Sequence, residues 1–499
     1  MQEITSQINR GNFVLAEKLC RQRLAEQPGD IPVNFLLAFV LWRESQPEEA
    51  LKWGRKALEL APADPGLLSD LGNLLRELGA HAEALGALDK SLELRPGNSG
   101  ACYNRALVLD AMGRDKETMQ LLEEISPGDP LFVKARFLRG TIRQDFGDTA
   151  GAEADFRDCI EANPDNAEAW YALASTRSFK PAETIFGELE RQLSRSAASS
   201  VQRSHYHFAL AKVLDDTGQY DAASEHLLSA NSLVDAGYDG PGIDSRLKLL
   251  CEQFQSPVRC ADSPHSTPAP VFIVGLPRSG TTLLEALLER HPGVLALGEL
   301  DLLPALISDF RQPPDTRDLH DNGKQYLAAL PPESRQASVV LDKMPGNFWR
   351  LGHITLMLPG AKIIHCHRDP RDVAISNFFN LYSTGNSFSY SLDHIAHYTA
   401  CHDAVMAHWK SLMGDRIFSL DYAELVADPQ RNMIAVTGFI GLDWDDDMLT
   451  APPEKRRIRT ASKWQARQEI YTTSIERWRL YPYLADEFTA HYRKYSGAL

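Results

Sequence analysis

The sequence lacks the features of an exported or disulfide-bonded protein. Its seven cysteines are dispersed over 499 residues without a C-x-x-C pair. An odd, scattered set of this kind favours reduced thiols in a cytosol-like compartment. The start, Met1-Gln2-Glu3-Ile4, has no basic segment followed by an apolar one, and no apolar run approaches the roughly 18 residues that a membrane span needs. We therefore expect a cytoplasmic protein that enters no membrane.

The sequence also lacks an excess of basic residues and a clear metal-binding motif. Its 52 lysines and arginines are outnumbered by 67 aspartates and glutamates, which gives a formal charge of -15. This balance argues against nucleic acid as a partner, because phosphate backbones attract basic surfaces. His365 and His367 flank Cys366 without a third ligand nearby, so we expect no metal. The length predicts two or three domains.

The front half of the chain contains a regular repeat. Five prolines fall 34 residues apart, and a small residue stands ten positions after each: Pro28, Pro62, Pro96, Pro130 and Pro164, followed by Ala38, Gly72, Ala106, Gly140 and Ala174. A second series shares the period: Ser45, Gly79, Gly113 and Gly147. This pattern is typical of tetratricopeptide (TPR) repeats, in which small residues let paired helices approach closely. One further hairpin, around a turn at Thr217-Gly218, extends the predicted repeat region to 1–235, and 236–269 is expected to be a linker.

From 270 to 499 the pattern changes to strands that alternate with helices. Short apolar runs at 271–274, 294–297, 338–341, 361–366 and 416–420 read as strands, with helical patterns between or after them. Such alternation predicts a parallel sheet covered by helices on both faces. The expected fold class is therefore an N-terminal TPR α-superhelix followed by a P-loop-like α/β domain. Ligands of such sheets bind beyond the carboxyl ends of the strands.

The first of these strands leads into a candidate phosphate-binding loop. Gly275 and Gly280 have the spacing of the P-loop frame G-x-x-x-x-G-K-[ST], but Thr281 stands where that frame has its lysine. The loop offers Arg278 and hydroxyl groups instead. Unpaired N–H groups and the positive dipole at the start of the following helix suit an anion. We therefore predict a phosphate cradle that is not designed for γ-phosphate chemistry.

The other predicted strands also end in polar residues. The second ends before Glu299, the third before Lys343, and the fourth before Arg368, with Ser376 two helical turns further on. Because the carboxyl ends of parallel strands share one edge of a sheet, these side chains are expected to lie around the loop.

Two of these stretches resemble the motifs of a known enzyme family. They are Gly275-Leu276-Pro277-Arg278-Ser279-Gly280-Thr281-Thr282 and Arg368-Asp369-Pro370-Arg371-Asp372-x-x-x-Ser376. Together they resemble the sulfotransferases that use 3′-phosphoadenosine 5′-phosphosulfate (PAPS). The first motif, with Gly298-Glu299, looks most like the tyrosylprotein sulfotransferase branch and its TPR-fused bacterial relatives. The segment from Arg459 to Arg467 is similar to a late loop of that branch, and the whole likeness covers roughly 270–480.

This resemblance implies a role for each matching residue. The nucleotide-binding set comprises Arg278, Ser279, Gly280, Thr281 and Thr282 at the 5′-phosphosulfate, Arg368 and Ser376 at the 3′-phosphate, and Arg467 in the late loop. Glu299 is the implied general base, and Lys343 and Ser462 lie against the bridging oxygen that leaves. The implied reaction needs PAPS as co-substrate and no metal. The implied acceptor is a hydroxyl, with a peptidyl tyrosine favoured over a carbohydrate or small phenol, and the repeat region is expected to bind the protein or peptide that carries it.

Two rival interpretations stay open at this point. A P-loop nucleotide kinase or NTPase would explain the glycine spacing, although Thr281 and the lack of a predicted strand ending in a Mg²⁺-binding aspartate oppose it. A TPR interaction scaffold with an inactive nucleotide-binding domain would fit the departure at Glu469, where the relatives carry proline. Magnesium-dependent ATP turnover would favour the first rival, and nucleotide binding without any transfer would favour the second.

Overall fold

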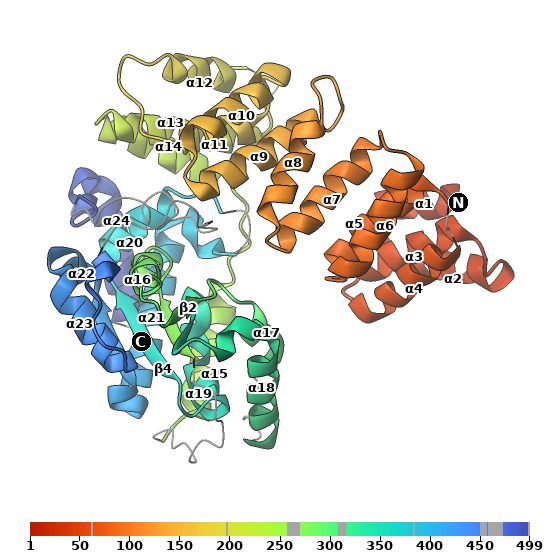
Figure 1. Ribbon diagram of the computed structural model, residues 1–499. Helices are drawn as coiled ribbons and strands as arrows, with labels where there is room; N and C mark the ends of the chain where they lie inside the picture. The colour runs from red at the N-terminus through yellow and green to blue at the C-terminus, as the bar shows by residue number, and fades with distance from the viewer. Residues whose placement is uncertain are drawn as a thin grey trace. The chain divides into compact units, whose positions relative to one another are not determined.

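The computed structural model describes residues 1–60, 63–195, 198–256, 270–307, 316–382, 385–449, 457 and 473–497 (Figure 1). The chain packs as two compact units. The first comprises Met1–Gln144 with Asp148–Ala169, and the second comprises Asp145–Gly147 with Trp170–Leu499.

The first unit is a series of paired helices. They are α1 (Gln2–Asn9), α2 (Phe13–Glu26), α3 (Ile31–Arg43), α4 (Pro47–Leu60), α5 (Pro65–Glu77), α6 (His81–Leu94), α7 (Ser99–Ala111), α8 (Asp115–Glu124), α9 (Phe132–Phe146) and α10 (Thr149–Ala162). The turns between paired helices place Ser45, Gly79, Gly113 and Gly147 at φ of 61°, 75°, 71° and 83°. These left-handed turns recur at the period of the sequence and confirm the predicted repeats.

The other small series of the repeat lies where paired helices touch. A Cβ added to Gly72 in α5 would stand 2.5 Å from Leu88 Cγ in α6, and one added to Gly140 in α9 would stand 2.8 Å from Phe156 Cε1 in α10. Neither site has room for a methyl group. The sequence series is therefore explained by close packing of the first helix of each pair against the second.

Replacing Gly72 by alanine is expected to destabilise the repeat unit. The added methyl group meets a fully buried leucine, and overpacking of this kind typically costs about 1–3 kcal/mol. Gly86 in α6 is the matched control, because its Cβ position meets nothing within 4 Å and alanine there should stabilise the helix by ~0.5–1 kcal/mol. Thermal unfolding of the Gly72→Ala, Gly86→Ala and parent chains measures both shifts. Equal midpoints for Gly72→Ala and the parent would show that the helix pair accommodates the methyl group.

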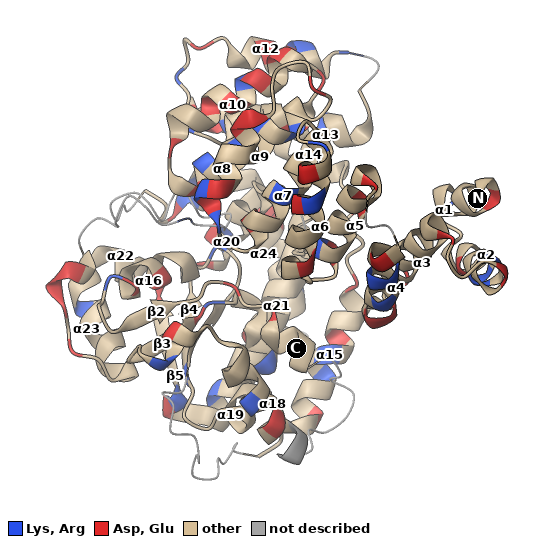
Figure 2. Ribbon diagram, turned by 45° about the vertical axis from the view of Figure 1, so that its right-hand side comes forward, with Lys and Arg blue, Asp and Glu red and all other residues tan. Residues whose placement is uncertain are grey.

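Charged residues of both signs cover the helices of the first unit (Figure 2). Two ion pairs repeat with the period of the sequence: Arg21 to Glu49 at 2.7 Å and Arg55 to Glu83 at 2.6 Å. All four side chains are more than a third exposed, so each pair contributes little to stability. The helices of the first unit thus present a solvated surface of mixed charge.

The second unit begins with helices that precede the sheet. They are the end of α11 (Ala167–Ala174), α12 (Ile185–Leu193), α13 (Ser200–Asp216), α14 (Tyr220–Ser232) and α15 (Gly240–Gln253). Helices α13 and α14 share a hydrophobic core with helices that follow the sheet strands, through Phe208, Leu227, Phe378, Ile395 and Phe488. The last predicted repeat hairpin therefore packs in the same unit as the sheet.

The stretch expected to be a linker, 236–269, contains a helix. Leu247, Leu250 and Phe254, on or just after α15, are buried in a core cluster that also includes Phe272 and Trp409. Residues 257–269 lie outside the described part of the chain. The domain boundaries at 235 and 270 stay predictions.

The second unit contains a parallel sheet in the order β2-β3-β1-β4-β5. The strands are β1 (Val271–Gly275), β2 (Val294–Ala296), β3 (Val339–Asp342), β4 (Lys362–His367) and β5 (Ile417–Asp421). Each lies within two residues of its predicted position, and the predicted fold class is confirmed. Alternate residues of β1 enter two different cores, Phe272 and Val274 on one face and Val271 and Ile273 on the other.

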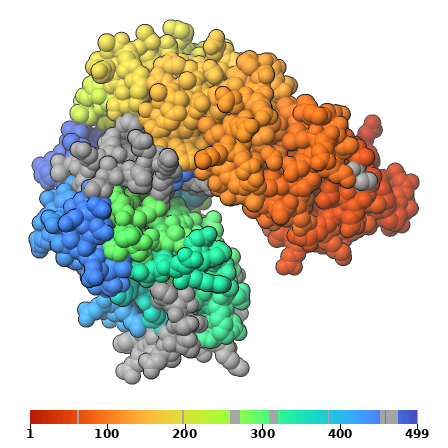
Figure 3. All heavy atoms as spheres, viewed as in Figure 1, coloured from red at the N-terminus to blue at the C-terminus, as the bar shows by residue number. Residues whose placement is uncertain are grey.

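Helices cover both faces of this sheet. The core on one face includes residues of α15, α18 (Thr316–Ala329), α19 (Leu351–Met357) and α21 (Leu392–Met413). The other face is covered by α16 (Thr281–Leu288), α22 (Tyr422–Ala427) and α23 (Pro429–Ile440), whose surfaces adjoin in Figure 3. Three further helices are α17 (Leu302–Leu306), α20 (Pro370–Phe378) and α24 (Pro482–Ser496). None of the helices in the described ranges is long and apolar enough to cross a membrane.

Candidate active site at the carboxyl edge of the sheet

The phosphate-loop candidate lies at the point where the sheet reverses its strand order. Strand β1 has β3 on one side and β4 on the other, which is the usual ligand position in an open parallel sheet. Two glycines let other backbone and side chains approach. A Cβ on Gly275 would lie 2.4 Å from the Cys366 carbonyl oxygen, and one on Gly280, at φ 103°, would lie 2.5 Å from a ring carbon of Tyr422.

The hydroxyl groups of the loop are buried beside the start of α16. Ser279, Thr281 and Thr282 are 1%, 4% and 7% exposed. The Ser279 Oγ has no hydrogen-bond partner among the described residues, although a buried hydroxyl normally has one. An oxygen of a bound phosphate or sulfonate would satisfy it, and the positive dipole at the start of α16 favours such an anion. The loop therefore fits an oxyanion ligand.

Arg278 and Ser376 meet across this loop. Arg278 Nε donates to Ser376 Oγ in α20 at 2.8 Å, and the arginine backbone has a φ of 74°. A positive φ is uncommon for a residue with a side chain. The conformation lets the Arg278 carbonyl oxygen accept from Arg368 Nη1 at 3.3 Å. The loop and the residues after β4 are thus connected directly.

Arg368, at the end of β4, is held on several sides. Its guanidinium lies 4.7 Å from the centre of the Tyr422 ring, donates to the Ser474 carbonyl oxygen and lies 3.6 Å from Asp372 Oδ2. Its Nε is buried without a hydrogen-bond partner among the described residues. This unsatisfied donor points to an anionic ligand as the missing partner.

Asp372 connects Arg368 to the chain near the C-terminus. Its carboxylate accepts the backbone N–H groups of Glu476 at 2.9 Å and Trp478 at 3.0 Å. Burial raises the pKa of this carboxyl group, and the charge of Arg368 opposes that rise. The segment from Ser474 to Trp478 is therefore bound to the start of α20 and borders the arginine.

Glu299 and Lys343 form a direct pair next to β2 and β3. Lys343 Nζ lies 2.5 Å from Glu299 Oε1; the lysine side chain is fully buried, while the Glu299 side chain is 42% exposed. A second carboxylate, Glu285 of α16, is only 3% exposed and has its Oε2 3.8 Å from Lys343 Nζ. Glu285 Oε1 also accepts the Gly298 N–H at 3.0 Å. The buried ammonium group thus lies between two carboxylates, of which only Glu299 reaches solvent.

Strand β3 ends on Asp342, so this aspartate is the residue to compare with the Mg²⁺-binding aspartate of an NTPase. Asp342 is fully buried and accepts a hydrogen bond of 2.8 Å from the Tyr326 hydroxyl group. Burial raises its pKa to about 7, while the Tyr326 hydrogen bond acts in the opposite direction. A carboxyl group that faces the core in this way differs from the ionised Mg²⁺ ligand of an NTPase.

The structure brings the predicted residues together as two linked groups. One contains the loop with Arg278, Ser376 and Arg368, and the other contains Glu299 and Lys343. Glu285 of α16 joins the helix that follows the loop to the second group. Ser462 and Arg467 lie outside the described residues.

Two residues of this region were missed by the sequence analysis. Tyr422 directly follows the fifth strand. The sequence analysis considered only the residues after the first four strands, and one more strand would have included Tyr422. Glu285 gave no signal, because it lies inside the apolar pattern of α16.

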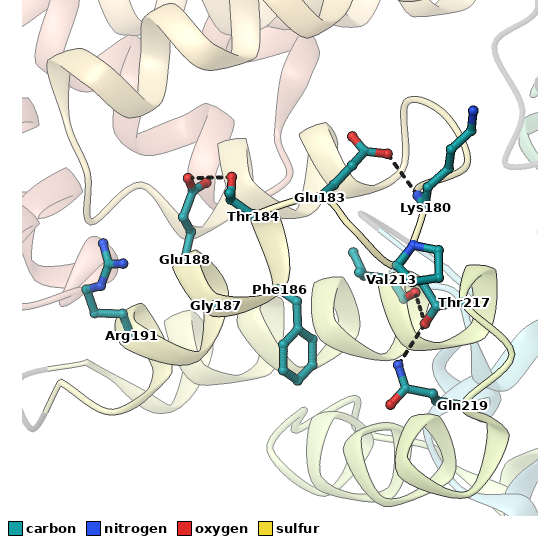
Figure 4. Close-up of a pocket in the computed structure, with 11 residues that line it drawn as sticks. Lys180, Glu183, Thr184, Phe186, Gly187, Glu188, Arg191, Val213, Thr217 and Gln219 are labelled. Carbon is teal, nitrogen blue, oxygen red and sulfur yellow. Dashed lines mark hydrogen bonds between the residues drawn. The ribbon is translucent and has the colours of Figure 1, made fainter.

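A separate cavity lies near the N-terminal helices of the second unit (Figure 4). It has a volume of about 640 Å³ and is lined mainly by residues around α12 and the end of α13, including Phe186, Val213 and Arg191. Several polar groups around it already have partners, as the contacts Lys180 N–H to Glu183 at 2.8 Å and Thr184 to Glu188 at 3.1 Å show. None of the predicted active-site residues lines this cavity.

Comparisons with known proteins agree with both halves of the fold. Residues 270–446 match the sulfotransferase family, and residues 137–176 match the tetratricopeptide repeat family. The chain therefore carries a sulfotransferase-family domain together with TPR repeats. This confirms the resemblance inferred from the two sequence motifs.

Relatives at low identity include proteins with and without a described activity. An uncharacterized protein of Aquifex aeolicus is 29% identical over 452 residues, which cover 85% of this chain and 59% of that protein. Protein-tyrosine sulfotransferase 2 of Gallus gallus is 23% identical over 197 residues, which cover 36% of this chain and 53% of that enzyme. Among solved structures, the sulfotransferase domain of the Synechococcus PCC 7002 olefin synthase matches 46% of this chain and 98% of its own length, with 21% identity and a TM-score of 0.34. The matched region thus spans little more than half of these first two relatives.

Proposed function

We propose that this protein transfers a sulfonate group from PAPS to an acceptor hydroxyl, and that it does so in the cytoplasm. The observation that carries the proposal is the pairing of two features at one sheet edge. Ser279 in the loop and Arg368 after β4 have unsatisfied donors, and a solvent-reaching carboxylate, Glu299, is paired with a buried lysine. The sulfotransferase-family domain of residues 270–446 supports it.

The proposed nucleotide contacts follow from the donors that are present. Ser279, Thr281, Thr282 and the N–H groups at the start of α16 would hold the 5′-phosphosulfate. Arg368 and Ser376 would hold the 3′-phosphate, with Arg278 between the two groups through its contact with Ser376. Tyr422 would keep the Arg368 guanidinium in place by stacking against it.

In the proposed reaction, Glu299 accepts a proton and Lys343 stabilises the negative charge on the leaving phosphate. As the acceptor oxygen bonds to sulfur, the bond between sulfur and the bridging phosphate oxygen breaks, and its electron pair stays with the departing phosphate. Glu299 takes the acceptor proton. A phenol has a pKa of about 10, far above that of a carboxylic acid, so the proton moves only as the new bond forms. The Lys343 ammonium group would stabilise the departing oxygen.

The proposed acceptor is a peptidyl tyrosine. The likeness to protein-tyrosine sulfotransferases supports this choice, and the TPR repeats would recruit the protein or peptide that carries the tyrosine. The test uses the full chain, radiolabelled PAPS and tyrosine peptides with matched phenylalanine controls. We expect label on the tyrosine peptides alone. Magnesium-dependent phosphoryl transfer from ATP in place of sulfonate transfer would overturn the assignment.

Glu285 is proposed as a positioning residue that acts through Lys343. Glu285→Gln keeps an acceptor for the Gly298 N–H but removes the buried negative charge 3.8 Å from Lys343. Lys343 then interacts more strongly with Glu299 and makes that carboxylate a poorer proton acceptor. The acidic limb of the pH–rate profile should therefore move to lower pH, and kcat should fall by about tenfold.

Glu285→Leu removes both the charge and the acceptor, and provides the comparison. It should in addition loosen the turn at Gly298 and cost more activity than Glu285→Gln. If Glu285→Gln loses activity without any change in the shape or position of the pH profile, Glu285 has only a structural role.

A further inference from the structure

Three potential metal ligands converge where α15 meets α21. His397 Nε2 lies 2.9 Å from Asp244 Oδ1, and Cys401 Sγ lies 3.8 Å from Asp244 Oδ1 and 3.7 Å from His397 Nε2. His397 and Cys401 are four residues apart on α21, so both point from the same face of that helix toward α15. This group is separate from the residues assigned to sulfonate transfer.

Two of the three distances between the ligand atoms are those that a zinc ion requires. Zinc–sulfur distances of ~2.3 Å and zinc–nitrogen or zinc–oxygen distances of ~2.1 Å, at tetrahedral angles, place sulfur about 3.6 Å from each lighter atom and nitrogen about 3.4 Å from oxygen. The two observed sulfur distances, 3.7 and 3.8 Å, agree with these values. The nitrogen–oxygen distance of 2.9 Å is shorter and is that of a hydrogen bond. Because the Asp244 side chain is half-exposed, it can move outward by the difference between the observed and the required nitrogen–oxygen distance.

Two of the three ligands are buried and the third is half-exposed, so solvent can reach a fourth coordination position. Cys401 is fully buried and His397 is 8% exposed, whereas the Asp244 side chain is 55% exposed. A thiolate, an imidazole and a carboxylate form a donor set typical of zinc. Water is available on the Asp244 side to complete a tetrahedron.

A fourth side chain is placed to orient the histidine. The Tyr238 hydroxyl group lies 2.6 Å from His397 Nδ1. Metal-binding histidines generally use their second ring nitrogen in such a contact, which fixes the ring orientation and the tautomer. Without a metal, Nε2–H donates to the Asp244 carboxylate and Nδ1 accepts from the Tyr238 hydroxyl group. The other tautomer, in which Nδ1–H donates to the tyrosine oxygen, presents the Nε2 lone pair to the space between Asp244 and Cys401.

We propose that Asp244, His397 and Cys401 bind one Zn²⁺ ion that fastens α15 to α21. Binding forms bonds from the metal to Asp244 Oδ1, His397 Nε2 and Cys401 Sγ. The Cys401 thiol releases its proton to solvent as the metal binds, and the imidazole proton shifts from Nε2, where it is donated to Asp244, to Nδ1, where it is donated to the Tyr238 oxygen. No oxidation state changes. This proposal differs from the sequence-based expectation of no metal, which had considered only His365 and His367.

Cobalt substitution tests the proposal through a signal that does not depend on transferase activity. The full chain, without an affinity tag and stripped by a chelator, is titrated with Co²⁺ and then with Zn²⁺. We expect a thiolate-to-cobalt charge-transfer band that saturates at one equivalent and is displaced by Zn²⁺. The band should be absent in Cys401→Ser and unchanged in the control Cys251→Ser, whose cysteine lies on α15 outside the ligand group.

Asp244→Asn guards against the possibility that Cys401→Ser fails to fold, because Asp244 is half-exposed and its replacement should leave the fold intact. We expect this variant to bind Zn²⁺ at least tenfold more weakly and to lose the rise in unfolding temperature that Zn²⁺ gives the parent chain. A parent chain that shows no charge-transfer band, or a band that persists in Cys401→Ser, would overturn the proposal and leave an ordinary Asp244–His397 hydrogen bond. Sulfonate transfer could still occur in that case, so the two proposals fail independently.

Discussion

Glu299→Gln is expected to lower kcat for sulfonate transfer by about 10²–10⁴-fold, the range typical of a lost general base. The variant keeps the size and hydrogen-bonding capacity of the side chain but can no longer take the acceptor proton. Lys343, fully buried, would keep Glu285 as a neighbouring carboxylate, so the lysine side chain should stay in place. Steady-state kinetics with a peptide acceptor measures the effect.

Nucleotide binding separates the possible causes of that loss. Isothermal titration of Glu299→Gln with 3′-phosphoadenosine 5′-phosphate should give nearly the parent Kd, because Glu299 is assigned to the acceptor. A large loss of nucleotide affinity would mean that Glu299 acts in binding. Full retention of kcat would mean that another group removes the proton.

Arg368→Ala is expected to weaken binding of 3′-phosphoadenosine 5′-phosphate by about 10–100-fold or more. Hydrogen bonds to charged groups contribute about 1.5–3 kcal/mol each, and every 1.4 kcal/mol corresponds to a factor of ten. Because the assigned partner of Arg368 is the 3′-phosphate, the variant should bind the nucleotides with and without that phosphate almost equally. Titration of the parent chain and the variant with both nucleotides gives the comparison.

Arg371→Ala is the matched control for this effect. Arg371 lies three residues away, pairs with Asp369 at 2.5 Å and stacks 3.7 Å from the Trp478 ring centre, and its side chain is 37% exposed. Its removal should change affinity by less than threefold. Equal losses for the two variants would indicate that general positive charge, and not a specific contact of Arg368, attracts the nucleotide.

The fold was largely predictable because each part has a local signal. Gly79 and its counterparts recur at a fixed period because every repeat needs the same left-handed turn, and Gly72 is small because Leu88 leaves no room for a side chain. Glu299, Lys343 and Arg368 could be grouped because parallel strands end at one edge of the sheet. Their shared edge follows from the parallel direction of the strands and requires no knowledge of side-chain contacts.

Other features depend on contacts between distant segments and gave no local signal. Glu285 lies inside the apolar pattern of α16, and its relation to Lys343 becomes visible only when α16 packs beside β3. Asp244 lies on a helix that precedes the first strand, and Cys401 lies on a helix that follows the fourth strand. Helix α15 was missed because its Gly and Pro residues make the stretch read as a linker. The order of residues along the chain does not predict that these side chains are in contact.

The central claim is that the edge formed by residues 275–282, Arg368 and Ser376 selects a nucleotide with phosphate groups at both the 3′ and 5′ positions. Isothermal titration of the parent chain with 3′-phosphoadenosine 5′-phosphate, adenosine 5′-phosphate and Mg²⁺–ATP tests this claim most directly. The account predicts one site per chain that binds the bisphosphate at least tenfold more tightly than either of the other two. Preferential binding of Mg²⁺–ATP, or no preference among the three, would contradict it.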